Sequence, residues 1–145
     1  MLQDKQRVID TLNTILELEM AGVVRYVHYS LMIFGYSRIP VVKWMRDQAV
    51  ESMNHAAEAG ERITTLGGHP SLKIGKLLET HHHGVQQILL EAIEHENNGI
   101  VLYHSLLDLV RDHDVALEEY ARSMIASETV HVSEIEKMLR SAREG

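Results

Sequence analysis

Four long segments of this chain repeat their apolar residues every three or four positions, and this period constrains the fold more than any other feature. Such a repeat is typical of one face of an α-helix, whereas a half-buried strand alternates every second residue. Proline, which interrupts helices, occurs only at Pro40 and Pro70. The pattern predicts helices over about residues 4–34, 41–66, 85–111 and 115–142, and therefore an all-α chain.

The connections between these helices predict how they are arranged. Short turns at residues 35–40 and 112–114 join the first pair and the last pair, so each pair should be antiparallel. Residues 67–83 have no helical pattern, and a connection of this length can span helices that are about 40 Å long. We expect one domain over residues 1–145, an up-down-down-up four-helix bundle with one long crossover between its second and third helices.

Each predicted helix carries a polar residue near the middle of its apolar face. These residues are Glu19 in the first helix, His55 in the second, Glu96 in the third, and Glu128 with His131 in the fourth. Because the middles of antiparallel helices lie at one depth, the five side chains should converge. Buried carboxylates are costly unless they are paired or bind a metal. Carboxylate oxygens with imidazole nitrogens suit iron, manganese or zinc, so the sequence predicts a metal site.

The second helix departs from the Glu-x-x-His spacing of the fourth helix. The position three residues before His55 is Ser52, and the nearest carboxylate, Glu51, lies four residues before the histidine. Residues four apart also share a helix face, so Glu51 is a candidate ligand of the same metal. The alternative is that Glu51 faces outward or lines an access path with Asp47, and the spacing favours neither interpretation.

Charge and composition exclude several classes of protein. The net charge of −7 disfavours nucleic-acid binding and favours the accumulation of cations. No apolar run of about 18 residues is present, so we expect no membrane partner. The chain has no cysteine and no secretory signal, which indicates a cytoplasmic protein. The triplet His81, His82 and His83 is expected to be solvated, because consecutive side chains point in different directions.

Five short motifs, taken in order, resemble the bacterioferritins. Residues 19–26 resemble that family's first ligand glutamate with a tyrosine seven residues later, and residues 53–56 resemble its Glu-Met-x-His-Ala segment. Residues 72–77 resemble its Leu-Gly-Lys-Leu segment, residues 96–99 its Glu-x-x-Gly, and residues 128–131 its closing Glu-x-x-His. The resemblance to this ferritin-like di-iron carboxylate family covers essentially the whole chain.

The resemblance implies a ferritin-like bundle that holds two non-haem iron ions per subunit. Residues matching Glu19 and His55 hold one iron in that family, and residues matching Glu96 and His131 hold the other. Its bridging carboxylates match Glu128 and position 52, which is a serine here. Bacterioferritins oxidise Fe(II) with dioxygen or peroxide, and these matched residues are therefore the expected catalytic residues. The missing carboxylate at position 52 makes full turnover depend on a substitute such as Glu51.

The resemblance also implies haem b held between two subunits by one methionine from each, and that methionine matches Met53. By spacing alone Met53 is an ordinary core or interface residue. No counterpart of the family's fifth helix was found, so we expect a homodimer, with a 24-subunit cage as the alternative. The expected function is Fe(II) oxidation for iron storage or detoxification. The alternatives are a haem- or metal-binding dimer without turnover, a di-iron oxidase that stores nothing, and a purely structural bundle.

Overall fold

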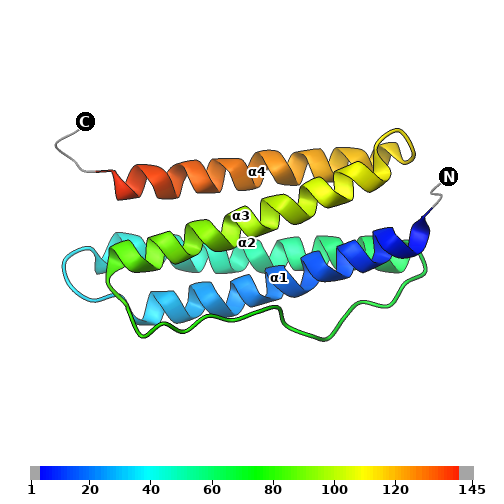
Figure 1. Cartoon of the computed structure of the whole chain (residues 1–145). Coiled ribbons are helices and arrows are strands. Elements are labelled where there is room, and N and C mark those ends of the chain that lie inside the picture. The colour runs from blue at the N-terminus through cyan, green and yellow to red at the C-terminus, as the bar shows by residue number, and fades with distance from the viewer. Residues whose placement is uncertain (1–3, 141–145) are drawn as a thin grey trace.

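The computed structural model describes residues 4–140, and four helices occupy most of this range. They are α1 (Lys5–Leu31), α2 (Arg38–Thr65), α3 (Val85–Val110) and α4 (Val115–Leu139). Within each of the pairs α1/α2 and α3/α4 the helices run antiparallel, and the crossover from α2 to α3 runs alongside α1 (Figure 1). The expected all-α four-helix bundle with one long crossover is confirmed. Within the described range no helix is long and apolar enough to cross a membrane.

The turn between α1 and α2 differs from the prediction by three residues on each side. Helix α1 ends at Leu31, after which Gly35 takes the left-handed conformation (φ +95°) that glycine adopts without strain. Arg38 begins α2, and its Nη1 donates to the carbonyl of Ile33 at 2.6 Å, which satisfies a carbonyl beyond the end of α1. Pro40 therefore lies inside the first turn of α2, where its missing N–H costs no hydrogen bond.

The turn before α4 agrees with the prediction, and the end of α4 differs from it. Asp114 caps α4, because its Oδ1 accepts a hydrogen bond from the backbone N–H of Leu117 at 3.0 Å. The helix ends at Leu139, whereas we expected residues 140–142 to continue it. Residues 141–142 lie outside the described residues, and Arg140 already has an extended backbone.

The core consists of two apolar clusters separated by a polar layer. One cluster occupies the half of the bundle at the start of α1, and the other occupies the opposite half. The buried polar residues between them come from all four helices: Glu19, Ser52, His55, His95, Glu96 and Glu128. The expectation that the polar interruptions share one depth is thus confirmed. Met138, three residues after the buried Ile135, is exposed.

The crossover is attached to α1 by backbone contacts. The N–H of Gly75 donates to the carbonyl of Glu17 at 2.8 Å. A Cβ atom at residue 75 would lie only 2.9 Å from that same carbonyl oxygen, so the close approach requires glycine. Asn13 holds the earlier part of the crossover, since it accepts from the N–H of Ser71 and donates to the carbonyl of His69. The later part of the crossover, residues 79–83, is consequently placed beside the end of α1.

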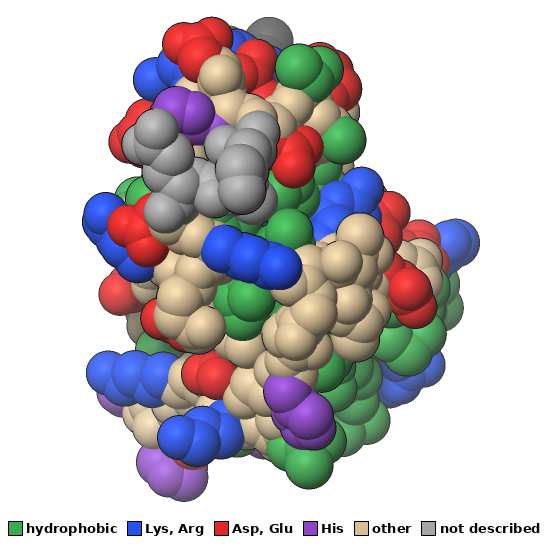
Figure 2. All heavy atoms as spheres, turned by 90° about the vertical axis from the view of Figure 1, so that its right-hand side faces the viewer, with side chains coloured by type: hydrophobic (Ala, Val, Ile, Leu, Met, Phe, Trp, Pro, Cys, Tyr) green, Lys and Arg blue, Asp and Glu red, His purple; other side chains and the backbone are tan. Residues whose placement is uncertain are grey.

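The end of the bundle that carries the α3–α4 turn is an ordinary solvated surface. Figure 2 shows acidic and basic side chains interspersed over this end. Exposed ion pairs form here between Arg111 and Asp108 and between Arg122 and Glu118, each at 3.4 Å. Such exposed pairs contribute about 0–1 kcal/mol each. The polar layer at the centre of the bundle is therefore the stronger candidate for a functional site.

Candidate metal centre

The polar layer contains two groups of three potential ligands that share Glu128. In the first group, His55 Nδ1 lies 2.7 Å from Glu19 Oε2 and 3.1 Å from Glu128 Oε1. In the second group, His131 Nδ1 lies 3.5 Å from Glu128 Oε2. Glu96 completes the second group, and in each group the three ligand atoms lie within 4.8 Å of one another. All five residues predicted from the apolar faces are thus brought together.

Two tyrosines hold the outer carboxylates of the two groups. The hydroxyl of Tyr103 on α3 donates to Glu19 Oε2 on α1 at 3.4 Å. In the reverse direction, the hydroxyl of Tyr26 on α1 donates to Glu96 Oε1 on α3. Each tyrosine follows the glutamate of its own helix by seven residues, or two turns, and bonds the glutamate of the facing helix. Each of the two outer carboxylates is therefore oriented by a hydrogen bond from the tyrosine of the facing helix.

Burial disfavours the charged form of each of these groups, and the contacts with neighbouring side chains decide which way each pKa shifts. Burial, followed by the nearby negative charge and hydrogen bond of Glu128, raises the pKa of Glu96 well above its usual value. Burial opposes ionisation of Glu128 as well, but its close contacts with Glu96, His131 and His55 outweigh burial and lower the pKa of Glu128. Burial would also lower the pKa of His55, yet its bonds to Glu128 and Glu19 raise it. Protons thus balance the charge of this cluster in the absence of another cation.

Glu128 also carries the observation that tests whether a metal fits. Its Oε2 atom is buried and accepts no hydrogen bond of normal geometry, since the nearest imidazole nitrogen, His131 Nδ1, is only an ion-pair contact at 3.5 Å. A buried carboxylate oxygen without a partner is costly, and a cation between the two groups would satisfy it. The donor set of three carboxylates and two imidazoles suits iron, manganese or zinc. The residues present therefore fit bound metal, and Glu128 would contribute an oxygen to each of the two groups.

Glu51 contacts this centre from the outside, through a histidine. Its Oε2 lies 3.0 Å from His131 Nε2, while Nδ1 of the same ring faces Glu128. The side chain of Glu51 is 40% exposed, and Glu51 belongs to neither group of three ligands. Ser52 is buried beside Gly22, where a Cβ atom on the glycine would lie 2.9 Å from Ser52 Oγ. Ser52 therefore faces α1 within the polar layer.

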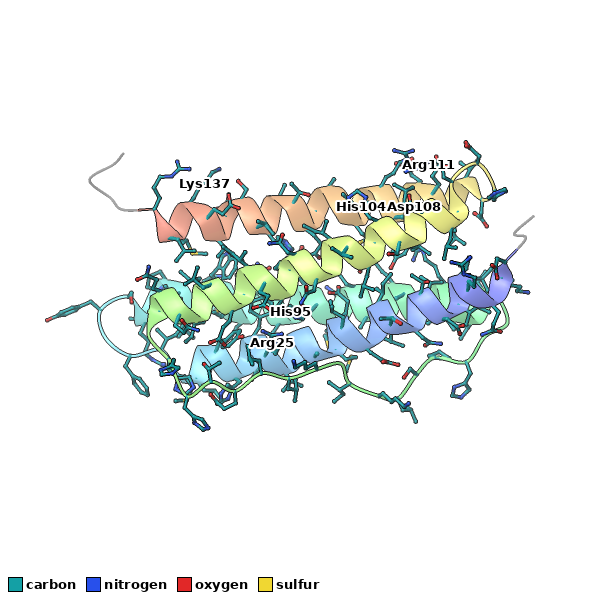
Figure 3. The ribbon with its side chains drawn as sticks, viewed as in Figure 1. Arg25, His95, His104, Asp108, Arg111 and Lys137 are labelled. Carbon is teal, nitrogen blue, oxygen red and sulfur yellow. The ribbon has the colours of Figure 1, made fainter. Side chains whose placement is uncertain are left out.

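A partly buried arginine–histidine pair lies next to the centre, and the sequence patterns did not single it out. Arg25 on α1 and His95 on α3 lie between these two helices (Figure 3), with Arg25 Nη1 3.2 Å from His95 Nδ1. Arginine can only donate, so His95 Nδ1 accepts and the ring proton lies on Nε2. Burial, reinforced by the charge of Arg25, lowers the pKa of His95 to about 4 and keeps the ring neutral.

The protonated nitrogen of His95 lies on the side of Gly22. A Cβ atom on Gly22 would be 2.9 Å from both His95 Nε2 and Ser52 Oγ, so the glycine makes room for both side chains. The sequence carried a signal for His95, since it lies three residues after Ala92 and four before Gly99, both on the buried face of α3. Only the pairing of α1 with α3 identifies its partner, Arg25.

The fold and the paired groups of carboxylates and histidines define a class of protein. Residues 9–144 match the ferritin family, described as a ferritin-like domain, and the chain belongs to this family. The resemblance seen in the sequence motifs is thus confirmed.

Individual relatives are similar over most of their length. The chain is 27% identical to a bacterioferritin of Rhodobacter capsulatus over 135 residues, which cover 92% of this chain and 83% of the relative. It is 28% identical to a bacterioferritin of Desulfovibrio desulfuricans over 138 residues, covering 92% and 75%.

Solved structures agree with this assignment. A ferritin-like, di-iron carboxylate protein from Bacillus anthracis has a TM-score of 0.90 at 25% identity, covering 97% of this chain and 100% of that one. The Rhodobacter capsulatus bacterioferritin, described with a metal-free dinuclear site and a haem iron, has a TM-score of 0.85 at 25% identity. That match covers 96% of this chain and 86% of the bacterioferritin.

Proposed function

We propose that this chain is a bacterioferritin-like protein that binds and oxidises Fe(II) at the centre of its bundle. The observation that carries the proposal is the pair of ligand groups that share Glu128, with a buried Glu128 oxygen that accepts no hydrogen bond. The description of the Bacillus anthracis relative as a di-iron carboxylate protein supports iron as the metal. Fe(II) is then the substrate, and dioxygen or peroxide is the oxidant.

We assign Glu19 and His55 to one iron and Glu96 and His131 to the other, with Glu128 between them. Iron supplies the electrons that pass to the oxidant. The side chains hold the ions and balance their charge: Glu96 and His55 give up protons when the ions bind, and the carboxylates then favour the more highly charged ferric product. Through their bonds to Glu96 and Glu19, the tyrosines keep the outer carboxylates in position.

Stopped-flow oxidation of Fe(II) tests this proposal. The purified chain should oxidise two Fe(II) per subunit faster than buffer alone, and an equal concentration of a variant altered only at the exposed Glu136 should match it. A rate equal to that of buffer would remove the enzymatic part of the proposal and favour a metal-binding bundle without turnover.

We further propose that Glu51 orients His131 rather than binding metal itself. A histidine that ligates a metal usually donates its other ring N–H to a carboxylate, and loss of that carboxylate lowers metal affinity about 10- to 100-fold. Glu51→Ala should weaken metal binding at the centre by this factor, as measured by isothermal titration with Co(II). Glu58→Ala, an exposed glutamate on the same helix, is the matched control.

The variant Glu51→Gln separates the two roles of this residue. Glutamine still accepts a hydrogen bond from His131 Nε2, but it is a poor metal ligand. We expect Glu51→Gln to retain most of the affinity of the wild type. A loss as large as that of Glu51→Ala would show that the carboxylate binds the metal directly.

A second candidate function, haem binding at a subunit contact, is favoured by the surface of α1 and α2. Met53 is 51% exposed and lies at a groove of about 470 Å³ between α1, α2 and the crossover, which is almost entirely apolar. Other outward-facing apolar residues on α1 and α2 are Val24, Val27, Leu31 and Val50. The haem iron described for the Rhodobacter capsulatus relative supports haem as an occupant, bound between two copies of this chain.

Adding haem to the purified chain tests this second function. A Soret band should shift on binding, and a homodimer should be found by mass measurement in solution. Met53→Leu should abolish the shifted band because leucine cannot ligate iron, whereas Met138→Leu, a change at another exposed methionine, should leave it intact. An unchanged band in Met53→Leu would exclude Met53 as the ligand.

A further inference from the structure

A second group of metal-ligating side chains lies away from the polar layer, where the crossover meets the last turn of α1. His28 Nε2 lies 2.8 Å from Glu79 Oε2, and His83 Nε2 lies 3.0 Å from Glu79 Oε1. One nitrogen from each imidazole and one carboxylate oxygen lie within 4.8 Å of one another. Two histidines and a carboxylate thus meet from segments that are about fifty residues apart in the sequence.

The backbone of the crossover is shaped so that Glu79 and His83 face α1 together. His81 between them has the left-handed conformation (φ 59°), which is uncommon for a residue other than glycine. Its N–H donates to Glu79 Oε1 at 2.6 Å and holds the carboxylate in place. Thr80 anchors the same segment, since its hydroxyl donates to Glu91 on α3 at 2.8 Å.

The expectation that the histidine triplet is solvated therefore needs correction at one position. His81 and His82 are exposed, as expected for consecutive residues. The side chain of His83 is only 23% exposed, and its ring packs edge-on against that of His28 with centroids 5.9 Å apart. Of the triplet, His83 thus packs against α1, whereas His81 and His82 are exposed to solvent.

The charges at this group favour a cation. The backbone N–H of His81, together with the side chain of His28, lowers the pKa of Glu79 to about 2, so the carboxylate is ionised at neutral pH. His28 lies in the last turn of α1. The C-terminal end of a helix carries partial negative charge, which also attracts cations.

We propose that His28, Glu79 and His83 form a second metal site for a divalent transition ion of the zinc type. Two imidazole nitrogens and one carboxylate oxygen are one of the ligand sets found in open tetrahedral zinc sites, where water is the fourth ligand. Magnesium and calcium prefer all-oxygen sites, so they do not suit this group. Ligand atoms around tetrahedral zinc lie about 3.3 Å apart. The contacts of 2.8 Å and 3.0 Å, which use different oxygens of Glu79, are close to this value, and the three ligand atoms of the group all lie within 4.8 Å of one another.

Zinc binding to the purified, metal-free chain tests this second site without using Fe(II) oxidation. Equilibrium dialysis with elemental analysis should find one zinc fewer per chain in His28→Ala and in His83→Ala than in the wild type. Glu79→Gln should lose the same equivalent. These surface changes leave the polar layer intact, so zinc bound at the centre stays constant, and circular dichroism confirms that each variant is folded.

The neighbouring histidine supplies the matched control. His82→Ala removes an imidazole from the same triplet and should retain the full zinc content. Equal zinc content in the wild type, His28→Ala and His83→Ala would overturn the proposal. Loss of zinc in His82→Ala to the same extent would also overturn it, because binding would then reflect histidine density rather than this geometry.

Discussion

Glu128→Gln is expected to remove two metal ions per chain from the bundle centre. Glu128 is the one residue that belongs to both ligand groups, so its loss affects both ions at once. Glutamine keeps the size of the side chain and one acceptor oxygen for the neighbouring imidazoles, but it carries no charge and bridges two metals poorly. Fe(II) oxidation should fall to the rate of buffer. Anaerobic dialysis against Co(II) measures the number of bound ions.

Two further variants make this result specific. Glu19 belongs to one group only, so Glu19→Gln should weaken the binding of one ion and leave the second in place. Glu134→Gln changes an exposed glutamate of the same helix and should have no effect. If Glu128→Gln binds as many ions as the wild type, Glu128 is not a bridging ligand and the assignment of the centre is wrong.

Loading the centre with metal is expected to stabilise the fold markedly. An ion that binds only the folded chain adds about 2.7 kcal/mol when its concentration is 100 times its dissociation constant. For a chain of this size that gain raises the melting temperature by about 5–10 °C. Differential scanning calorimetry with and without Co(II) measures the shift, and a chelator should reverse it.

Glu96→Gln separates this metal effect from the stability of the metal-free chain. Because burial keeps Glu96 protonated, glutamine resembles its metal-free state and can still accept the hydrogen bond of Tyr26. We expect the metal-free variant to unfold within about 1 kcal/mol of the wild type, while most of the metal-dependent shift is lost. A purely structural polar layer predicts instead that Co(II) shifts the melting temperature of neither protein.

Most of the bundle could be predicted from the sequence, because the buried face of each helix depends on the local order of its residues. The position of a residue on its own helix follows from a fixed period of 3.6 residues. Glu19, Glu96 and Glu128 could therefore be placed on the buried faces, and the length of the crossover predicted the topology. Helix ends were less well predicted at Leu31 and Arg38, because there the contacts of a turn decide the boundary.

Contacts between segments could be read only from the tertiary structure. The helical period predicts that Glu51 lies near the face of α2 that carries His55. The tertiary structure shows that the carboxylate of Glu51 contacts His131 on α4. The pairing of Arg25 with His95 depends in the same way on how α1 meets α3.

The sequence by itself determined which residues of each helix lie on the face toward the bundle centre, since these directions follow from the geometry of a single helix. Only the tertiary structure decided which residues from different segments meet. His83 joins His28 because Gly75 lets the crossover lie against α1, and no spacing within either segment contains that information. The buried face of each helix is a local property of the chain, whereas the register between packed segments is a property of the whole fold.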